Sequence, residues 1–192
     1  MKQAALTIGP QGAGKSTFCE RYVKEYPSVV LVSRDKILIE LFGDAYLEYG
    51  EGHIIGRQRM WEVIAEHLHG GCTKLILDCW NDNPIQRRDM ADYLRKLGVE
   101  VVEAWYFITP LDVCRQWFLG DFVPRKMGNI EGQKIMRKMK ELSYNRCYEN
   151  YHAEPVELEQ GFDVIHRINP LESPPLGILF QPLPQRVSVE SK

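Results

Sequence analysis

The stretch that decides the fold is GPQGAGKST, at residues 9–17. It fits the pattern G-x-x-x-x-G-K-[ST], in which glycines let consecutive backbone N–H groups curl around phosphate oxygens. A short apolar run precedes it and an amphipathic stretch follows it, which is the strand–loop–helix context that the pattern requires. The sequence therefore predicts a site for nucleotide phosphates at the N-terminus of a helix.

Side-chain chemistry suggests a role for each residue of this loop. We expect the Lys15 ammonium to neutralise the β- and γ-phosphate oxygens of ATP, and the Ser16 hydroxyl to ligate Mg²⁺. Asp78 follows the apolar run 74–77, so its carboxylate is a second candidate for Mg²⁺ at the sheet edge that faces the ligand. A turn or helix-capping role is the alternative for Asp78. The residues expected to bind the nucleotide are Gly9, Gly12, Ala13, Gly14, Lys15, Ser16 and Thr17.

Apolar runs alternate with helical periodicity along the chain. Strands are expected at 4–8, 29–32, 75–77, 101–108 and 162–168, and helices at about 15–26, 34–42, 54–69, 84–97, 110–118 and 130–148. Most of the strand runs are continuous rather than alternating, as in strands buried on both faces. The pattern therefore predicts an α/β fold, with a five-stranded parallel sheet sandwiched between helices. We expect one domain over residues 1–170 and a proline-rich tail over 171–192.

Composition narrows the class of protein. The chain has 192 residues, of which 44% are hydrophobic and 26% charged, as in ordinary globular proteins. It contains no run of the roughly 18–20 apolar residues that a membrane span needs, so we expect no membrane partner. The five cysteines are scattered and form no C-x-x-C pair, which favours reduced thiols and a cytoplasmic location. The net charge of −2 argues against non-specific coating of nucleic acid, although not against a local anion site.

Asp35 is the candidate general base. It comes directly after the second apolar run, so it is expected at the same sheet edge as the loop 9–17. A hydroxyl that attacks a phosphate needs a carboxylate to orient it and take its proton. Aspartate is also a common N-cap of helices, and spacing alone leaves both roles open.

Three motifs together resemble the kinase domain of 5′-hydroxyl polynucleotide kinases: GPQGAGKST, SRD at 33–35 and DCWNDNPIQRRDMADYLRKLG at 78–98. EPVELEQGFDVIHRINP, at 154–170, is similar to the stretch that enters the last strand of that family. The similarity spans about residues 3–170. The loop is highly specific for nucleotide binding, whereas the other motifs are shared with toxin-type and small-molecule kinases.

The resemblance implies roles for particular residues. Asp35 would be the general base, and a mobile helical lid at about residues 115–135 would supply an arginine to the phosphates. Arg125 aligns with the lid arginine and Arg115 is the second candidate. Asn81 and Arg87 match the family pattern that follows Asp78. The implied catalytic residues are Asp35, Lys15 and Arg125, and the implied substrate-binding residues are Arg34, Trp80, Asn81 and Arg87.

Departures from the family concern the acceptor. Leu38 stands where many relatives have an arginine that grips an acceptor phosphate, and Trp80 replaces a threonine. Residues 44–59 are expected to wall the acceptor pocket, where aromatic rings would stack a base and arginines would meet a phosphate. The alternative is aromatic packing under a loop, with solvated arginines. The residues concerned are Tyr46, Tyr49, Trp80, Arg57 and Arg59.

Three functions follow from these features. The favoured one is an ATP- and Mg²⁺-dependent kinase that phosphorylates the 5′-hydroxyl of a polynucleotide, at a DNA or RNA end. The second is a kinase of a nucleoside or another small hydroxylated molecule. The third is a switch or binding module that hydrolyses a nucleotide, which the absence of an N-K-x-D guanine-reading motif disfavours.

Overall fold

The architecture is seen in a computed structural model that describes residues 1–43, 51–79, 81–120 and 155–172. The strands are β1 (Gln3–Ile8), β2 (Val30–Ser33), β3 (Lys74–Asp78), β4 (Val101–Phe107) and β5 (Val164–Ile168). The helices are α1 (Lys15–Glu25), α2 (Arg34–Phe42), α3 (Glu51–His69), α4 (Pro84–Lys96) and α5 (Leu111–Gly120), and a short 3₁₀ turn, η1 (Leu158–Gln160), precedes β5. Every predicted strand is present, as are the predicted helices before residue 120; the helix expected at 130–148 lies outside the described residues.

The strands form one sheet with the order β2-β3-β1-β4-β5, and all neighbouring pairs are parallel. The five-stranded parallel sheet is therefore confirmed. Because the strands are parallel, their carboxyl ends share one edge, and the loops after β1, β2 and β3 meet there. Ser33 at the end of β2 pairs in register with Asp78 at the end of β3, so both loops leave the sheet at the same level.

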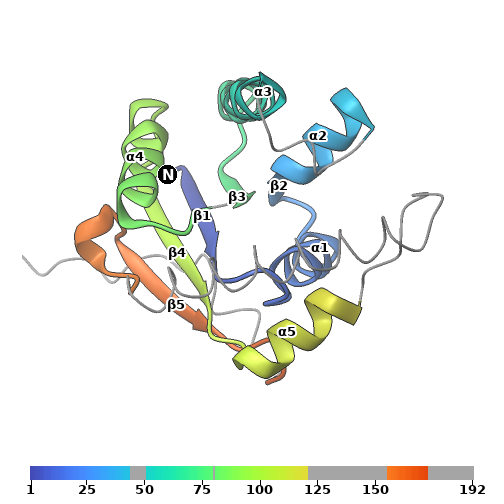
Figure 1. Cartoon of the computed structure of the whole chain (residues 1–192). Coiled ribbons are helices and arrows are strands. Elements are labelled where there is room, and N and C mark those ends of the chain that lie inside the picture. The colour runs from blue at the N-terminus through green and yellow to red at the C-terminus, as the bar shows by residue number, and fades with distance from the viewer. Residues whose placement is uncertain (44–50, 80, 121–154, 173–192) are drawn as a thin grey trace, which may run out of the picture.

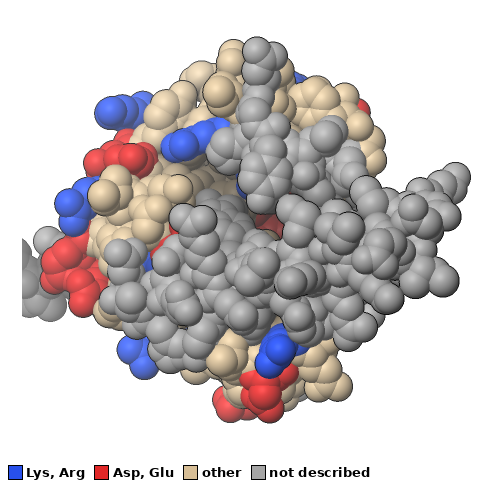
Figure 2. All heavy atoms as spheres, in the orientation of Figure 1, with Lys and Arg blue, Asp and Glu red and all other residues tan. Residues whose placement is uncertain are grey.

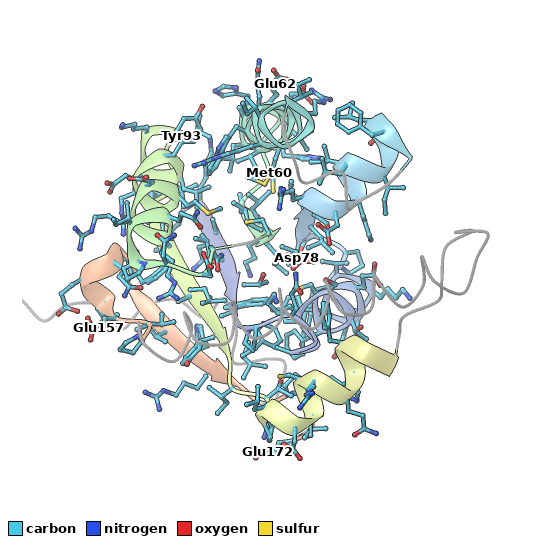
Figure 3. All side chains as sticks on the ribbon, viewed as in Figure 1. Met60, Glu62, Asp78, Tyr93, Glu157 and Glu172 are labelled. Atoms are coloured by element: carbon cyan, nitrogen blue, oxygen red, sulfur yellow. The ribbon has the colours of Figure 1, made fainter. Side chains whose placement is uncertain are left out.

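Helices cover both faces of the sheet, as the sequence predicts (Figure 1). On one face, α3 and α4 pack through residues such as Met60, Ile64 and Leu94. On the other, α1 packs through Phe18 and Tyr22. In Figure 3, Met60 points from α3 toward the sheet and Glu62 points away from it. This two-sided burial explains why the strand runs are continuously apolar rather than alternating.

A local signal accounts for the start of α4. Asn83 caps α4 by accepting a hydrogen bond from the backbone N–H of Gln86 at 2.8 Å, with Pro84 at the first position, which confirms the predicted start. At α2 the predicted start at residue 34 is also confirmed, whereas the N-cap alternative for Asp35 is wrong. The helix begins at Arg34 and its N-cap position is Ser33, so Asp35 lies inside the first turn and is not the N-cap.

Candidate active site

The phosphate-binding loop follows β1 and is pressed against α5. Gly12 and Gly14 have φ values of 76° and 82°, in the left-handed region that favours glycine. A Cβ on Gly12 would meet the backbone carbonyl oxygen of Cys114 in α5, so no side chain fits there. A Cβ on Gly14 would lie 3.2 Å from the Trp117 ring. The two glycines thus allow both the curl of the loop and its close approach to α5.

A buried threonine ties the loop to the turn between β4 and α5. The Thr109 hydroxyl donates to the carbonyl oxygen of Ala13 at 2.8 Å. The carbonyl of Thr109 itself accepts a hydrogen bond from the Cys114 thiol at 3.4 Å. This link fixes the loop to the turn between β4 and α5, just before α1 begins at Lys15.

Lys15 is the first residue of α1, and its side chain folds back onto the phosphate-binding loop. Its Nζ donates to the carbonyl oxygens of Gly9 at 2.8 Å and Pro10 at 2.9 Å. Burial lowers the pKa of Lys15 below its ordinary value, while the carboxylates of Asp78 and Asp35 act in the opposite direction. The charges of both aspartates therefore reach the Lys15 amine, as expected of groups that share one crevice.

Asp78 is the buried carboxylate at the end of β3, near the centre of the molecule in Figure 3. Its Oδ1 accepts a hydrogen bond from the Thr7 hydroxyl at 3.2 Å. The Asn81 amide group in turn donates from Nδ2 to the carbonyl oxygen of Thr7 at 2.9 Å. These bonds join the carboxyl end of β1, the end of β3 and the loop after β3 into one network.

The oxygen groups of this network fit Mg²⁺, which prefers hard oxygen ligands. The Asn81 Oδ1 atom is buried and, within the described part of the chain, has no hydrogen-bond partner. An orphaned acceptor of this kind suits a donor that arrives with a ligand. The residues that would hold the ion are Ser16, at the exposed start of α1, and Asp78, with Asn81 behind them.

Asp35 and its neighbours in α2 point in different directions. Asp35 is exposed in the first turn, whereas Arg34 is buried. Burial raises the pKa of Cys79, the residue after β3, to about 12. The positive charge of Arg34 acts in the opposite direction. Leu38 is fully buried and packs against Gly56 of α3. Leu38 thus joins α2 to α3 rather than lining a pocket.

Arg87 has a different place from the one that the resemblance implied. Its side chain is 0% exposed, so it presents no surface to a substrate. It donates to the carbonyl oxygens of Asn81 (3.1 Å), Asp82 (2.9 Å) and Pro155 (3.3 Å) and to Oε1 of Gln160 (3.1 Å). We therefore correct the expected substrate contact: Arg87 holds protein oxygens, two of them in the loop after β3.

The remaining candidates fall into two groups. Trp80, Arg125, Tyr46 and Tyr49 lie outside the described residues. Arg115 is exposed on α5, and Arg57 lines a groove of about 630 Å³ together with Trp61 and Tyr93. Arg59 is engaged on its own helix, because its guanidinium contacts Glu62 at 3.2 Å and Glu66 at 2.9 Å.

Sequence reasoning missed three residues that build the site: Thr7, Thr109 and Gln160. Thr7 carried a usable signal, since it is a polar residue in an otherwise apolar strand just before the loop. Thr109 precedes Pro110, a pattern that indicates a helix start rather than a site residue. Gln160 carries no local signal, because its partner Arg87 lies 73 positions earlier in the chain.

Comparison with solved structures agrees with this geometry. The fold is similar to a chain of the Pnkp1/Rnl/Hen1 RNA repair complex, with a TM-score of 0.58, 15% identity, and coverage of 76% of this chain and 45% of that chain. It is similar to a fungal RNA kinase, with a TM-score of 0.52, 13% identity, and coverage of 87% and 38%. It is also similar to shikimate kinase from Bacteroides thetaiotaomicron, with a TM-score of 0.53, 17% identity, and coverage of 90% of both chains.

These likenesses concern the fold. The chain spans less than half the length of the RNA repair proteins to which it is similar. No curated protein matches it. A family of AAA domains matches residues 5–119, which is more than half of the chain and includes the phosphate-binding loop, Asp35 and Asp78. The chain therefore belongs to this AAA domain family and has a P-loop kinase fold, as the resemblance to polynucleotide kinases led us to expect.

Proposed function

We propose that this protein transfers the γ-phosphate of ATP to a hydroxyl group, and that the preferred acceptor is the 5′-hydroxyl of a polynucleotide. The observation that carries the proposal is the position of Asp35. It is an exposed carboxylate in the first turn of α2, two residues after Ser33, which pairs in register with Asp78 at the end of β3. A hydroxyl acceptor needs a group that orients it and takes its proton, and a carboxylate in this position can do both.

In this proposal each residue has one task. The loop 9–17 cradles the phosphates through backbone N–H groups, and Lys15 neutralises their charge. Bound Mg²⁺, held by Ser16 and Asp78, would add positive charge at the phosphate oxygens. Asp35 orients the acceptor hydroxyl and takes its proton as the oxygen attacks the γ-phosphorus, and the bond from that phosphorus to the β–γ bridging oxygen breaks so that ADP leaves. An arginine, either Arg125 from the segment after α5 or Arg115 on α5 itself, supports the charge that develops on the transferred group.

The polynucleotide acceptor is supported by the motifs at 33–35 and 78–98 and by the similarity in fold to RNA kinases. On the described part of the face in Figure 2, basic and acidic side chains intermingle rather than forming a basic stripe. The continuous positive charge that tracking along a nucleic-acid backbone needs is thus not seen among the described side chains of this face.

A small hydroxylated acceptor is the second candidate. The observation in its favour is Leu38, which is buried where many polynucleotide kinases have a phosphate-binding arginine. An acceptor without a neighbouring phosphate would not need that arginine. The similarity in length and fold to a shikimate kinase is compatible with such an acceptor.

The deciding experiment offers γ-labelled ATP and Mg²⁺ with a panel of acceptors. The panel holds DNA and RNA oligonucleotides with 5′-hydroxyl ends, the same oligonucleotides already phosphorylated at the 5′ end, nucleosides and small alcohols. We expect label only on the 5′-hydroxyl oligonucleotides. Label on nucleosides or small alcohols alone would favour the second candidate, and release of phosphate to water with every acceptor would favour a switch.

A further inference from the structure

The loop after β3 is held from behind by a buried arginine. We propose that Arg87 and Gln160 form a clamp that positions the loop Asn81–Asp82 of the active site against the segment leading into β5. Arg87 is then a positioning residue that acts through Asn81 and touches no substrate. The catalytic part of this inference rests on the proposed phosphotransfer, whereas its structural part does not.

Within the described part of the chain, Arg87 bonds to oxygens from two stretches that are distant in sequence. Its Nε and Nη2 reach the carbonyl oxygens of Asn81 and Asp82, six and five residues before it. Its Nη1 reaches the carbonyl oxygen of Pro155 and the side chain of Gln160, 68 and 73 residues after it. A single guanidinium therefore joins the loop after β3 to the approach to β5.

Gln160 completes the clamp from the other side. It is 4% exposed, its Oε1 accepts from Arg87, and its Nε2 donates to the carbonyl oxygen of Pro155 at 2.8 Å. Both ends of its amide are thus used. The turn that carries Gln160 lies directly on α4, because a Cβ on Gly161 would come within 2.9 Å of the Ala91 Cβ.

The loop that the clamp holds is connected to the chemistry. Asn81 binds the carbonyl of Thr7, and Thr7 binds the carboxylate of Asp78. The carbonyl of Asn81 is also the acceptor for Arg87 Nε. A shift of the clamp would therefore move Asn81. It would also disturb Thr7, which binds the Asp78 carboxylate and lies at the carboxyl end of β1, just before the phosphate-binding loop.

The choice of arginine follows from the number and spread of the acceptors. Guanidinium offers five donors in a rigid planar fork, which can meet oxygens on two sides at once. The ammonium of lysine gathers its three donors at one point. Arg87→Lys would therefore leave some of the four oxygens without a donor, even though it preserves the charge.

The test compares Arg87→Lys and Gln160→Leu with the wild type in the full chain. The matched control is Arg88→Lys, on the next residue of α4, where an exposed guanidinium makes one contact, with the carbonyl of Glu159 at 3.3 Å. Hydrogen exchange is measured for the amides of residues 79–83 without ligand. Steady-state kinetics give kcat and the KM values for ATP and for the acceptor.

We expect both clamp variants to behave alike. Exchange at 79–83 should be at least about tenfold faster, and kcat should fall by about 10–100-fold, the scale on which a misplaced active-site group acts. The KM for ATP should stay within about threefold of the wild type, because the phosphate-binding loop is intact. Arg88→Lys should match the wild type in all three measurements. If Gln160→Leu does not fold, Gln160→Met, which keeps the unbranched shape, takes its place.

Two results would overturn the clamp. If Arg87→Lys raises the KM of the acceptor while the Gln160 variant is normal, Arg87 is a substrate ligand. If both variants lower the melting temperature but leave exchange at 79–83 and kcat unchanged, the cluster stabilises the fold without positioning the site. Should the wild type phosphorylate no acceptor at all, the proposed function fails, but the exchange experiment still decides whether the clamp exists.

Discussion

At the scale of single residues, the site depends on a few charges placed in a partly buried crevice. Lys15 is bonded to two carbonyl oxygens of its own loop, and burial lowers its pKa. Its place in the loop could be predicted from the sequence because a local motif specifies it. The role of Arg87 could not, because its partners depend on how distant segments pack.

Replacing Lys15 tests the nucleotide site. Lys15→Ala should abolish ATP turnover, since the lysine supplies charge to the β- and γ-phosphate oxygens that no neighbour in the loop can replace. The melting temperature should change little, because the loss of two hydrogen bonds is offset by relief from burying an ammonium. Turnover and melting curves are measured together. A folded variant that still hydrolyses or transfers at the wild-type rate would refute the assignment.

The cysteines give a prediction about pH. Burial raises the pKa of Cys79 to about 12 and that of Cys114 to about 11, so at pH 8 neither should form the reactive thiolate. In the unfolded chain these thiols would titrate near their ordinary pKa of 9.0, whereas in the folded protein they stay protonated to a higher pH. Their contribution to the free energy of unfolding is therefore full below pH 9 and is lost as the pH rises toward 11 to 12. Thiol titration at pH 8, with peptide mapping, should leave both unmodified in the native protein and modify both after denaturation. Rapid native labelling of either would contradict the burial described here.

At the scale of elements, the apolar runs predict the strands well because burial on both faces makes them continuous. Helix starts were harder to predict. Asn83 carries its own cap signal, whereas Asp35 was open to two roles, and the structure places it in the first turn of α2 rather than at the cap. The 3₁₀ turn η1 was not expected, since three residues are too few for a periodic pattern.

The contact between α2 and α3 gives a prediction about stability. Leu38 is 0% exposed and packs on Gly56, so Leu38→Ala should lower the free energy of unfolding by about 2–5 kcal/mol. The control is Ile39→Ala at the next residue, which is 43% exposed and should change it by less than about 1 kcal/mol. Urea denaturation measures both. Equal effects would mean that Leu38 does not carry the contact between the two helices.

At the scale of the whole molecule, the strand order brings the ends of β1, β2 and β3 to one edge, and that order creates the site. A parallel sheet could be inferred from the alternation of strands and helices, and Asp35 and Asp78 could be placed at its carboxyl edge. The hydrogen bonds between Thr7 and Asp78, and between Asn81 and Thr7, span more than 70 residues of sequence. No local pattern encodes such pairs, so the network behind the candidate ligands emerges only with the fold.

The most direct test of the central claim is single-turnover phosphoryl transfer by Asp35→Asn, to whichever acceptor the panel identifies. If Asp35 is the general base, transfer should fall by about 100-fold or more. ATP binding should persist, because the loop 9–17 and Asp78 are unchanged. The substitution removes a charge from the first turn of α2, which should cost no more than about 1 kcal/mol of stability. Wild-type transfer by a folded Asp35→Asn variant would contradict the account and would assign Asp35 to the stability of α2 alone.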